Sequence, residues 1–486
     1  METIQSLKPL YAVLVSLVAV VPIYLYRGRP NIRESWTFLA GFVKLGIILS
    51  MVPWILDGNL YELTLWQILP GLSLKFKVDG FGMLFALVAS SLFIVTSVYS
   101  IGYMRGLKEH AQTRYFCYFS LALSATIGVA FAGNLLTLYL FYELLSLSTY
   151  PLVTHHQDEE ARNGGRKYLI YLLGTSIGLV LPAMLITYNI AGTLDFMPGG
   201  ILAGLSLVKL APLLIAYMYG FGKAGLMPFH SWLPGAMVAP TPVSALLHAV
   251  AVVKVGVFSV CRVFTGITGT EFMTQANVVP IVCYIAGFTV IVASLIALYQ
   301  DNLKRRLAFS TIGQLAYIIM GVGLASDLGV IGGMTHIAMH AFGKITLFFC
   351  AGAIFVATGE KYISKMVGIG RRMPYTMGAF FIGALSVTGL PPTGGFISKW
   401  TMLLGAMDAG QTGIMVIYLV SSLLNACYFF PIVYNAFFCT DETAQYPDKV
   451  KEAPLLCIIP PLATAGMSIV LFFFPQIFMG FAKLMV

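Results

Sequence analysis

Charged residues are scarce in this sequence. Only 10% of its 486 residues are Asp, Glu, Lys or Arg, whereas 58% are hydrophobic. A chain of soluble domains carries far more charge, so that class is excluded. No polar stretch is longer than about twenty residues, so there is no room for a soluble catalytic domain between apolar runs of membrane-spanning length. The composition indicates an integral membrane protein.

Several chemical motifs are also missing. The seven cysteines are scattered and form no CxxC pair, which argues against iron–sulfur, zinc and structural disulfide roles. The GGRK stretch at 164–167 lacks the context of a P-loop, so ATP-driven transport is not supported. No histidine pair has the surroundings of a haem or metal site, and we predict no cofactor and no metal. The net charge of +9 comes from short basic loops, which topology explains better than nucleic-acid binding.

Apolar runs separated by polar breaks predict an all-α integral membrane fold with about fourteen transmembrane helices. The expected spans are 10–26, 35–56, 80–101, 115–132, 134–153, 167–190, 209–229, 240–264, 278–298, 307–325, 329–357, 375–405, 411–439 and 454–481. The first run has no small-residue cleavage site, so we expect a retained helix and not a signal peptide.

Successive loops between the predicted spans lie on opposite sides of the membrane, and the lysines and arginines are divided unequally between these two sides. One side holds Arg27, Arg29, Arg33, Arg105, Lys108, Arg114, Arg162, Arg166, Lys167, Lys304, Arg305, Arg306, Lys361, Lys365, Arg371, Arg372, Lys449 and Lys451. The other side holds Lys8, Lys75, Lys77, Lys209, Arg262 and Lys483. Basic loops stay in the cytoplasm. We therefore expect both termini on the non-cytoplasmic side of a cell (inner) membrane.

The remaining lysines, with one glutamate and three histidines, fall inside the predicted spans. They are Lys44, Lys223, Lys254, Lys344, Lys399, Glu143, His248, His336 and His340. An ionisable side chain at the bilayer centre costs about 2.5–3.5 kcal/mol on insertion scales, so we expect these groups to face the interior and form a polar axis. A lysine in low dielectric binds its proton less firmly, and a nearby carboxylate restores the affinity. Glu143, the only acid well inside a span, would thus act as a switch.

The spacing of these residues favours a proton relay. His336, His340 and Lys344 stand at i, i+4 and i+8, on one helical face and over about 12 Å. Proton hops must be short or bridged by water, which such a ladder allows. His248 and Lys254 predict a water-bridged continuation along another helix.

Two other ionisable residues, Lys44 and His230, each allow two interpretations. Lys44 has no polar neighbour at helical spacing, which suits a structural lysine or a contact with another subunit. His230 lies where a helix breaks, and it either caps local backbone or carries protons.

Two segments place a lysine beside helix-breaking residues. One is GFGKAGLMPFHSWLP, with Lys223 before Pro228, and the other is TGLPPTGGFISKW, with Lys399 after Pro391 and Pro392. Discontinuous helices in transporters mark the ion path. The segments belong to the seventh and twelfth spans, so they run in opposite directions and predict two inverted five-helix repeats. The expected division is 1–110 (helices 1–3), 111–265 (first repeat), 277–440 (second repeat) and 454–486 (helix 14).

Four motifs in order along nearly the whole chain carry a family resemblance. They are FYELLSLSTYPLV, FGKAGLMPFHSWLPGAMVAPTPVSALLHAVAVVKVGVF, FSTIGQLAYIIMGVGL with THIAMHAFGKITLF, and GLPPTGGFISKW. The sequence resembles the antiporter-like membrane subunits shared by respiratory complex I, Mrp-type cation/proton antiporters and membrane-bound hydrogenases. The motifs match that family's fifth helix, its broken seventh and eighth, its tenth and eleventh, and its twelfth.

The resemblance implies that Glu143 pairs with Lys223 and that Lys399 exchanges protons with the far exit. The residues implied to carry the proton between them are His248, Lys254, His336, His340 and Lys344. Mrp D-type and hydrogenase-type members resemble this sequence in having lysine at the position of Lys399, whereas one complex I member has glutamate there. Gly343 stands where the family often has a bulkier residue. The chain ends soon after span fourteen, so we expect no long lateral helix.

The sequence thus predicts a proton-translocating subunit of a multisubunit membrane complex, with or without exchange for Na⁺. It has no catalytic centre of its own, and its expected partners are other membrane subunits of an Mrp antiporter, a hydrogenase or an NADH/quinone oxidoreductase-like complex. The alternative is a structural anchor subunit with a vestigial channel. A quinone-reactive enzyme is disfavoured, because no cofactor motif is present.

Overall fold

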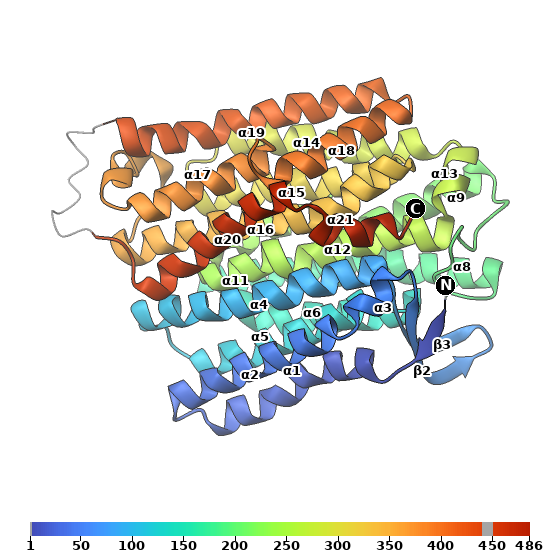
Figure 1. Ribbon diagram of the computed structural model, residues 1–486, viewed down its shortest axis with the longest axis horizontal. Coiled ribbons are helices and arrows are strands. Elements are labelled where there is room, and N and C mark those ends of the chain that lie inside the picture. The colour runs from blue at the N-terminus through green and yellow to red at the C-terminus, as the bar shows by residue number, and fades with distance from the viewer. Residues whose placement is uncertain (1, 440–450) are drawn as a thin grey trace.

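Long helices lie side by side in this structure, a computed structural model that describes residues 2–439 and 451–486 (Figure 1). The helices are α1 (Lys8–Leu25), α2 (Pro30–Leu49), α3 (Val52–Leu56), α4 (Gly80–Gly106), α5 (Gln112–Ala130), α6 (Leu135–Val153), α7 (Glu159–Thr175), α8 (Leu181–Ala191), α9 (Leu207–Gly220), α10 (Trp232–Gly235), α11 (Thr241–Ala245), α12 (Val252–Arg262), α13 (Thr270–Gln275), α14 (Val279–Leu298), α15 (Leu303–Gly323), α16 (Asp327–Thr358), α17 (Pro374–Thr388), α18 (Gly394–Asp408), α19 (Thr412–Phe438), α20 (Leu455–Phe473) and α21 (Gln476–Lys483). Residue 440, the last of the predicted second repeat, and Lys449 lie outside the described residues.

This helical bundle confirms the predicted fold class. Within the described ranges, eleven helical segments are long and apolar enough to cross a membrane. The other expected spans correspond to α5 and to the broken segments α9–α10 and α17–α18, so the count of about fourteen stays a prediction. Both termini lie at the same end of the bundle (Figure 1), as an even number of crossings requires. The protein is therefore a multi-pass membrane protein.

Helix starts coincide with polar capping residues at the edges of the apolar runs. The carboxylate of Asp79 accepts a hydrogen bond from Gly82 N at the start of α4. The side-chain oxygen of Asn134 accepts one from Thr137 N at the start of α6. Each cap satisfies a backbone N–H that has no partner inside the helix.

A small sheet at the end that carries the termini was not predicted. It contains β1 (Thr3–Gln5), β2 (Leu60–Leu69) and β3 (Leu72–Val78), with β1 parallel and β3 antiparallel to β2. Gly71 turns the hairpin with φ +72°, a conformation that glycine adopts without strain. The alternating apolar and polar residues of β3 were the missed signal.

The two broken helices occur in the predicted spans, but the first break begins earlier than expected. Helix α9 ends at Gly220, so Lys223 lies inside the break, in a short 3₁₀ turn, and does not precede it. Gly225 follows with φ +68°. The glycines, and not Pro228, therefore end the helix. In the second segment α17 ends at Thr388 and α18 begins at Gly394, with Lys399 after the break as predicted.

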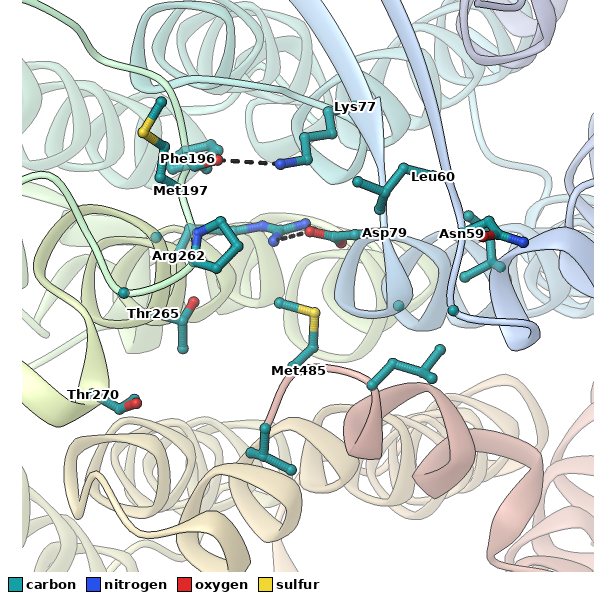
Figure 2. Close-up of a pocket in the computed structure, with 18 residues that line it drawn as sticks. Asn59, Leu60, Lys77, Asp79, Phe196, Met197, Arg262, Thr265, Thr270 and Met485 are labelled. Atoms are coloured by element: carbon teal, nitrogen blue, oxygen red, sulfur yellow. Dashed lines mark hydrogen bonds and ion pairs between the residues drawn. The ribbon is translucent and has the colours of Figure 1, made fainter. Parts of the chain in front are cut away.

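A buried ion pair joins α4 to α12 at the end that carries the termini (Figure 2). The two guanidinium nitrogens of Arg262 lie 2.6 Å from the two carboxylate oxygens of Asp79. Arg262 was expected among the few basic residues on one side of the membrane. Its side chain is instead buried, with the guanidinium near the rings of Phe81 and Phe258. A cavity of about 270 Å³ adjoins the pair.

The Asp79 carboxyl responds to two opposing effects. Burial, the largest effect, raises its pKa, but the Arg262 guanidinium, the Gly82 N–H and the Lys77 charge together lower it by more, so the pKa lies below its ordinary value. The stabilisation is then complete above the unfolded-state pKa of about 3.9. It is lost only as the pH falls through the lower pKa of the folded state. The ion pair therefore holds the helices together throughout the neutral range.

Replacing Asp79 by Asn is expected to lower the free energy of unfolding by about 3–5 kcal/mol, because it leaves the Arg262 charge buried without a partner. The measurement is the thermal unfolding midpoint of the purified protein in detergent. Asp408→Asn, the same change at an exposed carboxylate of α18, should alter stability by less than about 0.5 kcal/mol. Equal midpoints for the two variants would contradict this account.

Candidate functional site

The lysines and histidines predicted inside the membrane are all buried in the structure. These residues are Lys44, Lys223, Lys254, Lys344, Lys399, His248, His336 and His340. Lys399, the most accessible of them, is 7% exposed. Glu143 is half-buried, yet both of its carboxylate oxygens are shielded and lack a hydrogen-bond partner.

Lys223 is held by α6 from the break after α9. Its Nζ donates to the Tyr142 carbonyl at 2.8 Å and to Ser146 Oγ at 2.6 Å. The same nitrogen lies 3.1 Å from the centre of the Tyr142 ring, a cation–π contact. The Lys223 backbone N–H donates to Tyr142 Oη at 3.1 Å. Helix α6 therefore positions both the backbone and the ammonium group of this lysine.

The expected Glu143–Lys223 ion pair is not formed. The ion pairs of the described residues do not include it, and neither Glu143 oxygen accepts a hydrogen bond. Tyr142 and Ser146 lie one turn apart on the face of α6 that meets Lys223. Glu143 projects about 100° away from Tyr142, because the α-helix has 3.6 residues per turn. The carboxylate is next in sequence to the lysine's partner but faces a different direction.

Gly256 lets α12 pack directly against the break that holds Lys223. A Cβ atom at position 256 would lie 2.2 Å from the Ala224 nitrogen and 2.4 Å from the Lys223 carbonyl carbon. Only a residue without a side chain permits this approach. Lys254 lies two residues before Gly256 on the same helix, so this close packing also fixes the position of Lys254 relative to Lys223. The buried lysines and histidines, taken in this order, are called the row below.

Lys254 contacts His340 of α16 directly. Its Nζ lies 2.6 Å from His340 Nδ1, a hydrogen bond in which the donor depends on which nitrogens carry protons. Two cations at this distance would repel each other strongly, so the pair holds one proton between its two nitrogens. The His340 ring stacks on that of His336, with centroids 5.8 Å apart. The predicted ladder on α16 is thus joined to α12 at His340.

His336 continues the row toward α18. Its Nδ1 lies 2.8 Å from Ser398 Oγ, and its Nε2 lies 3.0 Å from Gln314 Oε1 of α15. The amide oxygen can only accept, so Nε2 donates to Gln314. The one hydroxyl proton of Ser398 serves either His336 Nδ1 or the Gly395 carbonyl, which lies 3.2 Å from the same Oγ. Ser398 is the residue before Lys399, which places the end of the histidine ladder beside the last lysine.

Backbone carbonyls freed by the second break hold Lys399. The last carbonyl groups of α17 have no helical partner because the helix ends at Thr388. Lys399 Nζ donates to the carbonyls of Val387 and Thr388 at 2.8 and 3.1 Å. It also lies 3.5 Å from Ser422 Oγ and 4.5 Å from the centre of the Tyr317 ring. The broken helix thereby supplies the polar partners that the membrane does not.

Lys344 forms a branch from the ladder. Its Nζ donates to Ser310 Oγ at 2.7 Å, and Tyr428 Oη donates to the same oxygen at 3.0 Å. Gly343 has a packing reason, because a Cβ there would lie 2.7 Å from Ser386 Oγ. Because residue 343 has no side chain, α17 packs closely against α16 at this position.

Among the predicted residues that the structure describes, Lys254 and His340 alone are hydrogen-bonded to each other. His248, His230 and Lys44 contact none of the others by a hydrogen bond or a ring contact. His248 lies in a π-helical turn, 246–250, against the Phe348 ring, and both of its nitrogens lack partners. His230 is half-buried, with Nδ1 unpartnered. Lys44 is fully buried inside this chain, which does not suit a contact with another subunit.

The polar residues that connect the row were missed by the sequence analysis. They are Tyr142, Ser146, Ser310, Gln314, Tyr317, Ser398, Ser422 and Tyr428. None is charged at neutral pH, so a search for ionisable groups passes over them. The available signal was a buried amide or hydroxyl in the motifs that carry the lysines and histidines, such as Gln314 in STIGQLAY.

A bundle with broken helices around a buried row of amines and imidazoles defines an antiporter-like membrane subunit. A family model described as "NADH:quinone oxidoreductase/Mrp antiporter, TM" matches residues 132–425, more than half of the sequence. The chain belongs to this family.

Two curated relatives support this assignment. NADH-quinone oxidoreductase subunit N of Desulforudis audaxviator is 32% identical over 449 residues, covering 87% of this chain and 86% of that protein. Na(+)/H(+) antiporter subunit A1 of Staphylococcus aureus (strain JH9) is 32% identical over 511 residues, covering 97% of this chain and 62% of that protein. The chain thus spans less than two thirds of the antiporter subunit's length.

Solved structures share the fold. A chain of the Mrp complex from Dietzia sp. DQ12-45-1b superposes with a TM-score of 0.86 at 20% identity, covering 99% of this chain and 97% of that chain. A chain of the membrane-bound sulfane sulfur reductase, an archaeal respiratory membrane complex, gives a TM-score of 0.86 at 23% identity, with the same coverage. The fold is therefore that of membrane subunits found in multisubunit complexes.

Gly256→Ala is expected to destabilise the protein by about 1–3 kcal/mol, because the added methyl group overlaps the backbone of the Lys223 break. Gly174→Ala is the matched control, since nothing lies within 4 Å of a Cβ at that exposed position of α7. The control should be neutral or gain up to about 1 kcal/mol from helix propensity. Thermal unfolding midpoints and amide hydrogen exchange around residues 221–225 measure both effects. Equal behaviour of the two alanines would contradict the close packing.

Proposed function

We propose that this chain carries protons across the membrane as one subunit of a multisubunit complex. The observation that carries the proposal is the series of close contacts from Lys254 to His340, from His340 to His336 and from His336 to Ser398, the residue before Lys399 on α18. Each of these groups can hold or pass a proton, and each is shielded from lipid. A purely structural core would gain nothing from buried amines that lack a carboxylate partner.

The Glu143–Lys223 pair is the proposed switch of this pathway. In the described conformation Lys223 is held by Tyr142 and Ser146, while the Glu143 carboxylate has no partner. Turning the carboxylate toward the lysine would strengthen the lysine's hold on its proton, and turning it away would release that proton toward Lys254. An unpartnered buried carboxylate is costly, which favours a second conformation in which the pair is closed.

Two half-channels would connect this row to the two sides of the membrane. The proposed division assigns one to the first repeat, 111–265, and the other to the inverted second repeat, 277–440, flanked by 1–110 and 454–486. The broken helices of the two repeats supply Lys223 and Lys399. The excess of basic residues in alternate loops supports an orientation with both termini on the non-cytoplasmic side of the cell membrane.

The likeness to relatives extends the proposal to energy source and partners. Similarity to NADH-quinone oxidoreductase subunit N suits a redox complex in which electron transfer elsewhere drives proton movement. Similarity to Na(+)/H(+) antiporter subunit A1 suits exchange of protons for Na⁺, driven by the proton gradient. In either complex the proposed neighbours of this chain are other membrane subunits.

Glu143→Gln is expected to reduce proton transport by about tenfold or more, because a barrier increase of about 1.4 kcal/mol suffices for that factor. Glutamine keeps the shape of the side chain but cannot supply the charge of the switch. Proton uptake is measured with a pH-sensitive dye in vesicles containing the assembled complex. Glu159→Gln, the same change at an exposed residue of α7, should leave uptake unchanged. Normal transport by Glu143→Gln would refute the switch.

Lys399→Ala separates transport from a scaffold role. We expect normal assembly of the complex, measured by native electrophoresis, together with loss of proton pumping, because the proton loses its last buried carrier. If the variant instead fails to assemble while residual complexes pump normally, the chain is a structural anchor and the proposed pathway is wrong.

A further inference from the structure

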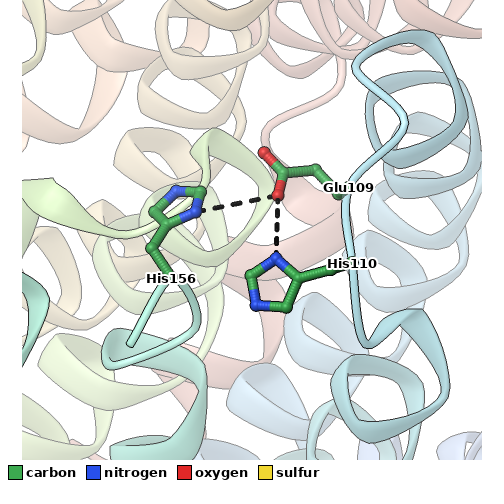
Figure 3. A group of neighbouring side chains, drawn as sticks. All are labelled: Glu109, His110 and His156. Carbon is green, nitrogen blue, oxygen red and sulfur yellow. Dashed lines mark ion pairs between the residues drawn. The ribbon is translucent and has the colours of Figure 1, made fainter. Parts of the chain in front are cut away.

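A second group of ionisable side chains lies outside the membrane-spanning row, at the connections α4–α5 and α6–α7 (Figure 3). Glu109 and His110 come from the first connection and His156 from the second, and their side chains point toward one another. The nearest nitrogens of His110 and His156 lie 4.0 and 3.7 Å from the same Glu109 oxygen. One ligand atom from each residue falls within a mutual distance of 4.8 Å.

A fully buried histidine supports this group from behind. His155 has no exposed surface, and neither of its ring nitrogens has a hydrogen-bond partner. Its Nε2 points at the same Glu109 oxygen, at 3.7 Å. Its ring lies 4.8 Å from that of His110, centre to centre, and its carbonyl accepts a bond from Arg114 at 2.7 Å. Three imidazoles from two separate connections thus surround one carboxylate oxygen.

The backbone around the group is held in an unusual conformation. Lys108 and Ala111, on either side of Glu109 and His110, have φ values of 53° and 49°. Gln157, directly after His156, has a φ of 61°. The left-handed region costs a residue with a side chain about 1–2 kcal/mol, and such strain tends to persist at functional sites. Both connections therefore contain strained backbone conformations directly next to the residues of this group.

The surrounding charges do not exclude a cation. Arg105, the nearest arginine of α4, is engaged by the Glu34 carboxylate and by Asn31. Arg114 is directed to the His155 carbonyl. An open groove lined in part by Lys108, Glu109 and Gln112 reaches the carboxylate from outside. The Glu109 side chain is thus 11% exposed at the edge of this groove, and no arginine of the described residues forms an ion pair with it.

We propose that Glu109, His110 and His156 bind a divalent transition-metal ion of the zinc class. Imidazole nitrogens with one carboxylate are ligands that zinc, nickel, cobalt and copper accept, whereas calcium and magnesium prefer oxygen alone. Three protein ligands leave one tetrahedral position for water. His155 is a positioning residue, since its Nε2 lies 3.7 Å from the ligating carboxylate oxygen and would orient it.

Binding would need only a small closure of the side chains. Zinc–nitrogen and zinc–oxygen bonds are about 2.0–2.2 Å long, so ligand atoms on one ion lie roughly 3.3 Å apart. The distances of 3.7 and 4.0 Å from Glu109 are already close to this separation. The ion would tie the end of α6, the helix that holds Lys223, to the connection that follows α4.

Zinc binding to the full-length protein tests the proposal. The protein is purified in detergent with a tag free of histidine, exposed to excess Zn²⁺, passed through a desalting column and analysed for metal content. We expect about one retained zinc per chain, with a higher thermal midpoint because the ion binds only the folded state. Substitution of Co²⁺ should produce the visible absorption bands of a tetrahedral nitrogen–oxygen site.

Matched variants decide the result. His110→Ala, His156→Ala and Glu109→Gln should each lose the retained zinc and the zinc-dependent rise in midpoint, while their midpoints without zinc show that they are folded. Glu159→Gln, at the start of α7 and outside the group, should keep both. Wild-type protein that retains no zinc, or ligand variants that bind it as tightly as the control, would overturn the site. Neither outcome depends on proton transport.

Discussion

An ammonium group inside a membrane has to find oxygen or nitrogen atoms that are not already used by a helix. In this protein most of those atoms come from places where regular helix stops or from side chains one turn apart. Lys399 takes the carbonyls that α17 leaves free at its end, and Lys344 takes a serine hydroxyl of α15. Lys223 sits in the break itself and reaches a carbonyl and a hydroxyl of α6. The second break therefore supplies the oxygens that bind Lys399, whereas Lys223 and Lys344 bind groups of the uninterrupted helices α6 and α15.

This arrangement explains why the lysines can take part in proton movement. Carbonyl and hydroxyl oxygens stabilise an ammonium group through hydrogen bonds, but they do not lock the proton in place as a bound carboxylate would. The Lys254–His340 contact goes further, because the partner can itself accept the proton. These contacts suit the proposed pathway, in which a proton moves over short steps.

The sequence predicted that the lysines and histidines inside the spans are buried, because the cost of exposing charge to lipid depends on residue type and span, but it missed buried charges at the span ends such as Arg262. It also predicted the two breaks, since glycine and proline act locally. It did not predict the orientation of Glu143, which depends on how α6 is turned against Lys223. Gln314, Ser310 and Ser398 were missed because only tertiary packing shows that they touch the row. Glu109 and His156 were missed as neighbours because two connections far apart in sequence bring them together.

Ser398 and Lys399 are consecutive residues on α18, and their side chains are bonded to two different parts of the protein. Ser398 meets His336 on α16, while Lys399 meets the end of α17. Consecutive residues on a helix cannot rotate independently about its axis. A roll of α18 that shortens one of these contacts must therefore alter the other. Helix α18 therefore couples these two contacts. A small shift of His336 against Ser398 also changes how Lys399 contacts the end of α17, without any change in charge.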